Sequence, residues 1–393
     1  AKRIARENER FYYWFELLSW EKALLEEAYE SGEFTKDLDA LIEEERSVIE
    51  KLRNLAAYHI LYSKINYVFR SGGYVRSDEE RAMVAEISEH PLIVGKNTAL
   101  SRRAATICFY TQGFCQWARR DWRLSLEKFQ RVKQILDENP SIKADLPKRY
   151  IRTLNYIINA QTELMELEAA RGNIALMRSL EDEPGFGGIN IQSQIQVMSM
   201  LGELRLLDRA GEHARAVEMT VRVVDAMEQL GPRLHKENAL ELQWVLACVH
   251  FGAGQMNKAL HWLNQVLNDN EQVLRQDIFN YARLFNLVVH YELGNYDLLI
   301  YIVRSTQRFL GKRQQVLQVE RLLIDSIKKL SRPNEPAQKR ELFTALHAQL
   351  TELLKDPAEQ LVLKYFDVLA WAEAHATGRT FSEVVRQRAG QPV

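Results

Sequence analysis

A short turn-like motif returns along the chain at nearly constant spacing. The copies are "RGNIALM" at 171–177, "AGEHARA" at 210–216, "AGQMNKA" at 253–259 and "LGNYDLL" at 293–299. Their glycines lie 39, 43 and 40 residues apart. Similar turns are expected at Gly32-Glu33-Phe34, Gly72-Gly73-Tyr74, Arg120-Asp121-Trp122 and Gly378-Arg379-Thr380. A period of about 40 residues with two helices per period is typical of a repeat solenoid rather than of unrelated globular domains.

Helical periodicity fills the segments between these turns. Apolar residues recur at three- and four-residue intervals, as in Trp14, Leu17, Leu18, Leu25 and Ala28, and no strand-like block interrupts them. Helix starts and ends are marked by Ser77-Asp78-Glu79-Glu80, Asp356-Pro357, Gly378 and Thr380-Phe381-Ser382-Glu383. The sequence therefore predicts an all-α protein.

Regular apolar spacing follows four of the turns. The positions are Ser125, Phe129 and Val132; Ala216, Thr220 and Val223; Ala259, Leu263 and Val266; Leu299, Val303 and Thr306. The first residue is small in three of the four sets, as a close approach of two helices requires. The helix before each turn carries a partner position, at Gly113, Leu204, Ala247 and Leu287.

This pattern resembles the tetratricopeptide repeat (TPR), and the resemblance implies a right-handed α-solenoid of helical hairpins. It covers about 100–310 and is weaker at both ends. The period exceeds the roughly 34 residues of the standard unit, and the proline after the second helix stands in register only at Pro140. We therefore expect degenerate TPR-like repeats. The segment "FELLSWEKALLEEAY" (15–29) also resembles part of large, uncharacterised bacterial helical-repeat proteins.

Three regions of one continuous solenoid are expected. Residues 1–95 would form an N-terminal helical bundle or divergent repeats, residues 96–330 the TPR-like repeats, and residues 331–393 a C-terminal hairpin with a capping helix. The chain begins at Ala1, without Met and already in a helix-like pattern, so we expect that a preceding segment has been removed.

Charge and composition exclude several classes of partner. The formal net charge is −1, which argues against a nucleic-acid-binding protein. No apolar run approaches the roughly 20 residues that span a bilayer, so no membrane association is expected. Cys108, Cys115 and Cys248 form no disulfide framework. This usage indicates a cytoplasmic protein.

Catalytic motifs are absent from the sequence. It contains no GxSxG elbow, Walker A motif, HExxH pair or kinase signature. No two histidines are spaced i, i+4, so no metal site is expected. The glycine-rich stretch 184–189 follows no strand and precedes no Lys-Ser or Lys-Thr, so we interpret it as a loop between helices. We predict no enzyme and no cofactor.

In a TPR-like superhelix the first helices of successive hairpins line the concave groove. The residues predicted to face it are Tyr110, Phe114, Trp117, Asn159, Arg205, Trp244, Phe251, Tyr281 and Tyr291. Their aromatic character suits an extended peptide or an amphipathic helix. Tyr110 and Phe114, or Leu201 and Arg205, stand where a chaperone-tail clamp would place Lys and Asn. Packing between adjacent hairpins is the alternative explanation of these aromatics.

Two functions follow. The first is a scaffold or adaptor that binds a protein or peptide through its concave face without catalysis. The second is a bacterial regulator that senses a peptide or small ligand, with an N-terminal helical bundle before the repeats. In that case residues 1–90 would be the bundle, with Phe11, Tyr12, Trp14 and Trp20 as its core.

Overall fold

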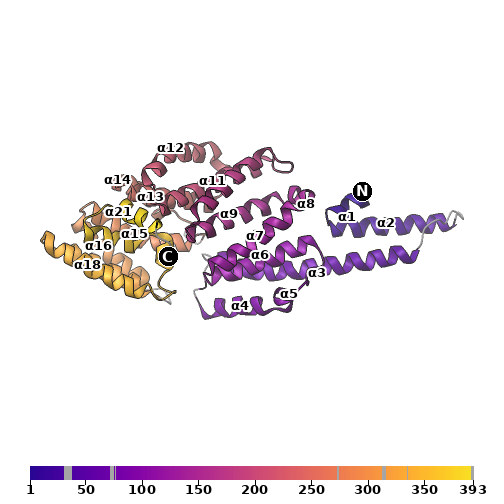
Figure 1. Cartoon of the computed structure of the whole chain (residues 1–393), viewed down its shortest axis with the longest axis horizontal. Coiled ribbons are helices and arrows are strands. Elements are labelled where there is room, and N and C mark those ends of the chain that lie inside the picture. Colours follow the sequence, from indigo (N-terminus) through magenta and orange to yellow (C-terminus); the bar gives the residue numbers. More distant parts are fainter. Residues whose placement is uncertain are drawn as a thin grey trace. The chain divides into compact units, whose positions relative to one another are not determined.

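The computed structural model describes residues 1–30, 38–70, 75, 77–271, 274–311, 316–333 and 335–390. Within these residues the chain forms 21 α-helices and two short 3-10 helices, and no strand occurs among them (Figure 1). The all-α prediction is confirmed. No helix in the described ranges is long and apolar enough to cross a bilayer.

Five consecutive helical hairpins occupy the middle of the chain. They pair α6 (Arg102–Ala118) with α7 (Trp122–Asp137), α9 (Pro147–Glu163) with α10 (Leu167–Ser179), α11 (Ile189–Arg209) with α12 (His213–Leu230), α13 (Lys236–Gly252) with α14 (Met256–Leu267), and α15 (Gln276–Glu292) with α16 (Tyr296–Leu310). In each pair a short turn of three residues joins the end of the first helix to the start of the second.

A left-handed residue closes each of these hairpins. The φ angles are 64° at Arg120, 59° at Met165, 70° at Gly211, 74° at Gly254 and 71° at Gly294. These residues are 45, 46, 43 and 40 positions apart. The first two repeats are therefore longer than the period of about 40 residues that the spacing of the glycines predicts. The conformation lets the amide after the turn bond to a carbonyl of the preceding helix.

Two of the predicted boundaries are wrong. Gly172 lies inside α10, so the turn expected at 172–174 does not exist there, and Met165 makes it instead. No helix begins at Pro357: Asp356 accepts a hydrogen bond from the amide of Ala358 at 2.8 Å and forms a local turn. The turns expected at Gly32 and Gly72 lie outside the described residues.

The predicted packing positions within the hairpins are confirmed. All twelve, from Ser125 to Thr306, are at most 5% exposed. In the α6–α7 hairpin the close approach is explicit, because a Cβ at Gly113 would stand 2.9 Å from the ring of Phe129. Ser125 Oγ donates to the carbonyl of Gly113 at 2.9 Å. The small residues Gly113 and Ser125 thus let the backbones of α6 and α7 approach.

The chain divides into two compact units. Unit 1 comprises residues 1–164 and 173–195, and unit 2 comprises residues 165–172 and 196–393. Besides the hairpins, unit 1 contains α1 (Lys2–Glu7), α2 (Phe11–Glu30), α3 (Leu38–Arg70), α4 (Asp78–Glu89), α5 (Pro91–Val94) and α8 (Pro140–Asp145). Unit 2 adds α17 (Gln318–Leu330), α18 (Pro336–Leu353), α19 (Leu361–Tyr365), α20 (Val368–Thr377) and α21 (Phe381–Ala389). The three predicted regions stay a prediction.

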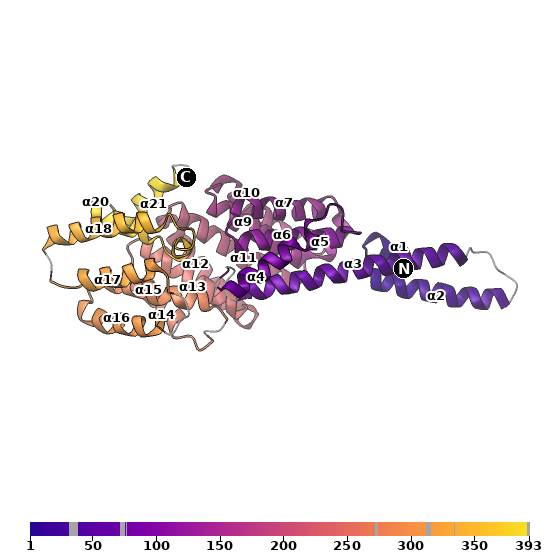
Figure 2. The same cartoon turned by 90° about the horizontal axis from the view of Figure 1, so that it is seen from below.

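The N-terminal helices α2 and α3 of unit 1 pack on each other through apolar side chains. Helix α2 runs beside α3 (Figure 2), with Phe11 and Trp14 buried between them. The bundle core was predicted to include Tyr12 and Trp20 as well, and this is wrong: they are 62% and 67% exposed. The face of α2 opposite the core is therefore aromatic and exposed.

Candidate functional site

The predicted groove residues all lie on the first helices of hairpins, as expected. Four are in unit 1 and five in unit 2. The aromatic ones are at most 6% exposed: Tyr110, Phe114, Trp117, Trp244, Phe251, Tyr281 and Tyr291. Asn159 and Arg205 are partly exposed. Their role in binding stays a prediction, but the two units bury their aromatic residues in different ways.

In unit 2 a later part of the same chain covers the aromatic face. We call residues 359–389 the C-terminal segment. Its Tyr365 stacks on Tyr281, with ring centroids 4.1 Å apart and planes inclined by 13°. The same ring lies 6.4 Å from Trp244. Tyr365 also donates a hydrogen bond of 2.8 Å to Asp277.

The next residues of the C-terminal segment continue this coverage. Phe366 lies 5.1 Å from Phe251 and 4.7 Å from Phe285, measured between ring centroids. Trp371 lies 5.9 Å from Tyr291. Its indole N–H donates to Glu292 at 2.7 Å. The four aromatic groove residues of unit 2 thus contact the chain's own C-terminal segment.

A buried ion-pair network lies beside the Tyr281–Tyr365 stack. Arg275 donates to both carboxylate oxygens of Asp277, at 3.0 and 2.9 Å, and its Nη1 lies 3.1 Å from Glu241. Burial alone would raise the pKa of Asp277, but the adjacent guanidinium of Arg275 holds that pKa well below its usual range. Glu241 also pairs with Arg205. Arg205, predicted to face the groove, therefore belongs to this network.

One contact of α21 has the residue types of a serine hydrolase. His213 Nδ1 lies 2.7 Å from Ser382 Oγ, and its Nε2 lies 3.1 Å from Asp208. Ser382, however, donates its single hydroxyl hydrogen to the carbonyl of Gly252 at 2.7 Å. The imidazole therefore faces a lone pair of Ser382, and no general base is directed at that hydroxyl hydrogen. The arrangement connects α21 to α12, through His213, and to α13, through Gly252.

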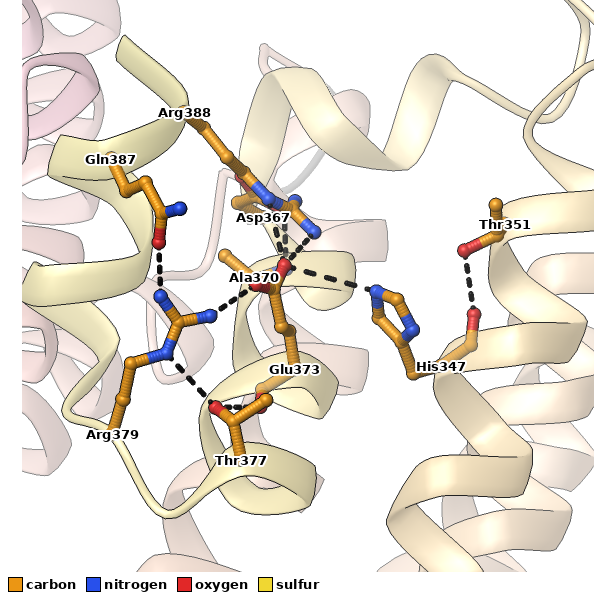
Figure 3. Close-up of polar contacts among 9 residues, drawn as sticks. All are labelled: His347, Thr351, Asp367, Ala370, Glu373, Thr377, Arg379, Gln387 and Arg388. Atoms are coloured by element: carbon orange, nitrogen blue, oxygen red, sulfur yellow. Dashed lines mark hydrogen bonds and ion pairs between the residues drawn. The ribbon is translucent and has the colours of Figure 1, made fainter. Parts of the chain in front are cut away.

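Helices α20 and α21 are joined by a second cluster, around Glu373 (Figure 3). Arg388 Nε donates to Glu373 at 3.1 Å, and its Nη1 lies 3.3 Å from Asp367. Arg379 also binds Glu373, and His347 of α18 lies 3.8 Å from the same carboxylate. Two arginines thus converge on one acidic residue that lies between three helices. The cluster holds the C-terminal segment together.

A cleft of about 690 Å³ opens between the C-terminal segment and helices α12–α14 of unit 2. Its walls include Phe251, Met256, Trp371 and Phe381. On its rim, Arg386 donates to the carbonyl of Gly211 at 3.2 Å. Ionisable side chains also line it: Glu292, His375, Arg379, Glu383 and Arg386.

In unit 1 the predicted aromatic residues pack on one another. Tyr156 of α9 lies 5.9 Å from Tyr110, 5.0 Å from Phe114 and 5.5 Å from Trp117, between ring centroids. Tyr156 itself is partly exposed. The aromatic cluster therefore forms the core between α6 and α9, with Tyr156 as its accessible edge.

A cationic patch adjoins this cluster. Arg149 Nη1 donates to Thr106 Oγ1 at 2.9 Å, and among the described residues no carboxylate pairs with Arg149. Burial lowers the pKa of Arg149. Arg152, one turn further along α9, is exposed and likewise has no carboxylate partner in the described ranges. The hydroxyl of Tyr110 is buried and makes no hydrogen bond within the described chain.

Sequence reasoning missed both the C-terminal coverage and Arg149. A signal for Arg149 did exist: Arg149, Arg152 and Tyr156 follow one another at spacings of three and four, which places them on one face of α9. No acidic residue stands three or four positions after either arginine. The coverage had no local signal, because the covering residues lie about 80 to 120 positions after those they cover.

Comparison with known proteins supports the fold. No protein-family model matches the sequence, and no curated protein matches it significantly. A solved structure of similar fold is that of a Rap protein complexed with Competence and Sporulation Factor. The match covers 98% of this chain and 99% of that chain, with a TM-score of 0.52 and 11% sequence identity. At this identity the likeness concerns the fold, which is a TPR-like helical repeat.

Proposed function

We propose that this chain is a protein- or peptide-binding scaffold that performs no catalysis. The observation that carries the proposal is the accessible edge of the unit 1 hairpins, where Tyr156 and Asn159 lie on the first helix of a TPR-like hairpin. The Rap protein of similar fold is complexed with another molecule, Competence and Sporulation Factor. Proteins built from such repeats commonly use an extended surface for recognition.

The partner is assigned to unit 1 rather than to unit 2. In unit 2 the equivalent aromatic residues are already in contact with Tyr365, Phe366 and Trp371. A partner there would have to displace aromatic stacking and the hydrogen bond from Tyr365 to Asp277. The proposal places the protein in the cytoplasm, since its three cysteines are free and buried. It includes neither a nucleic acid nor a membrane as a binding partner.

A screen of the full-length protein against a library of peptides of about ten residues tests this function. Tyr156→Ala and Asn159→Ala are the informative variants, because both side chains are partly exposed and Tyr110 and Trp117 are not. We expect enriched peptides whose Kd rises at least tenfold in the double variant. Gln130→Ala, an exposed position on α7, is the matched control. Equal affinity for all three proteins, or no enrichment, contradicts the proposal.

A second candidate is the ligand-sensing bacterial regulator. It is favoured by the exposed aromatic face of α2, where Tyr12, Tyr13 and Trp20 are 62%, 57% and 67% exposed. An output surface of that kind would bind a second protein while the repeats hold the ligand. The two candidates are distinguished by measuring whether a peptide from the library changes the hydrogen exchange of α2. A scaffold predicts no change there.

A further inference from the structure

An arginine without an acidic partner in a half-buried position is the starting observation. Taking a guanidinium out of water is costly unless an anion compensates its charge. Arg149 has one hydrogen bond, to a neutral hydroxyl, and four further N–H donors. Asp145, four residues earlier, pairs with Arg10 and Arg103 instead. The folded chain therefore leaves the charge of Arg149 uncompensated within its described residues.

The groups around Arg149 are also donors or neutral. Thr106 and Tyr110 stand four residues apart, on one face of α6. Tyr62 of α3 lies 5.8 Å from Tyr110 between ring centroids. Burial, followed by the neighbouring phenols Tyr156 and Tyr62, raises the pKa of Tyr110 well above its ordinary value, so its hydroxyl keeps its proton and can donate. Arg152 adds a second positive charge at the exposed side.

We propose that Arg149, together with Arg152, binds a carboxylate of the partner peptide. A planar guanidinium offers two parallel N–H groups that match the two oxygens of a carboxylate. A phosphoryl group is the competing anion for a guanidinium, and the test below separates the two. The inference rests on the proposed function, since it names the part of the peptide that the unit 1 face recognises.

The site can be tested without any peptide. In full-length protein, phenylglyoxal modifies accessible arginines, and peptide mass mapping gives the modification rate at each position. We expect sodium acetate to slow the modification of Arg149 at least threefold relative to sodium chloride at equal ionic strength. Arg222, an exposed arginine of α12, is the internal control and should be unaffected. Absence of protection by acetate overturns the inference. Stronger protection by inorganic phosphate than by acetate also overturns it, in favour of a phosphoryl ligand.

A peptide experiment separates this inference from the proposed function. For a peptide enriched in the screen, replacing its carboxylates by amides should raise Kd at least tenfold with the wild-type protein and leave Kd unchanged with Arg149→Met. Acetate protection without any enriched peptide would keep the anion site and contradict the proposed function. Enriched peptides that bind wild type and Arg149→Met equally would keep the function and contradict the carboxylate anchor.

Discussion

At the scale of single residues, Arg149 should lower the stability of the free protein. Its guanidinium is half-buried and unpaired in the described chain. Replacement by Met, of similar length, removes the desolvated charge and keeps apolar contacts. We expect Arg149→Met to raise the free energy of unfolding by about 1 kcal/mol in urea titrations. Arg222→Met, at an exposed position, should change it by less than about 0.5 kcal/mol. A loss of stability in Arg149→Met would mean that its bond to Thr106 outweighs the charge.

Asp277 should make the protein sensitive to acid. Its pKa is depressed in the folded chain, so the unfolded chain takes up its proton more readily. The stabilisation is therefore present above the ordinary value of 3.8 and is lost as pH falls below it. Asp277→Asn should cost about 3 to 5 kcal/mol at pH 7, because Arg275 loses its main partner. Urea unfolding from pH 7 to 3 should show a smaller loss for this variant than for wild type. Asp225→Asn, an exposed acid, should follow wild type.

Individual turn residues show what the sequence can and cannot indicate. Gly211, Gly254 and Gly294 were predicted because glycine takes a positive φ without steric cost. Met165 takes the same conformation, and a methionine gives no such signal. Gly172 gave a false signal, because a glycine inside a helix is tolerated at a cost of roughly 1 kcal/mol. In such cases the packing of neighbouring hairpins determines which residue forms the turn.

At the scale of elements, the start of α17 depends on a distant side chain. Leu317, the N-cap residue, offers no side-chain acceptor. Glu359 supplies it: its two carboxylate oxygens accept from the amides of Gln318 and Val319 at 3.0 and 2.9 Å. A carboxylate also interacts favourably with the helix N-terminus. The first residue of the C-terminal segment therefore anchors that segment to α17.

Removing the Glu359 carboxylate should destabilise both the start of α17 and the C-terminal segment. We expect Glu359→Ala to cost about 1.5 to 3 kcal/mol, because two amides at the start of α17, one of them buried, lose a charged acceptor. Hydrogen exchange of the amides at 318 and 319 should accelerate at least tenfold. Glu352→Ala, whose side chain is 73% exposed, is the control and should leave these amides unchanged. Unaltered exchange in Glu359→Ala would show that water replaces the carboxylate without loss.

Helices were predictable where the apolar pattern and a local cap agree. Thr380 and Glu383 exchange hydrogen bonds as a capping box, as predicted. Ser77 accepts from the amide of Glu80 at 3.1 Å. Asp356-Pro357 has the same local appearance but starts no helix, and Asp356 accepts from the amide of Ala358 in a local turn instead. A cap predicts a helix only if tertiary contacts leave the following residues available.

At the scale of the whole molecule, the repeat period predicted the architecture but not which aromatic residues are accessible. Each hairpin repeats the same local contacts, so spacing alone identifies them. Coverage of Trp244 and Tyr281 depends on Tyr365, which follows them by 121 and 84 positions. Contacts at such separations leave no periodic trace. The composition of a groove can thus be predicted from sequence more readily than its accessibility.

This coverage makes a prediction about where a partner binds. A peptide from the library that carries a photoreactive benzophenone should crosslink to unit 1, at α3, α6 or α9, and bind the full-length chain with a stoichiometry of one. Trp244 and Tyr281 should stay unmodified, because each contacts Tyr365. In Tyr365→Ala/Phe366→Ala, which removes about 3 kcal/mol or more of aromatic packing, crosslinks at α13 and α15 should appear. Mass spectrometry locates them. Crosslinks at Trp244 or Tyr281 in the wild-type protein would mean that a partner displaces the C-terminal segment, and would move the binding face to unit 2.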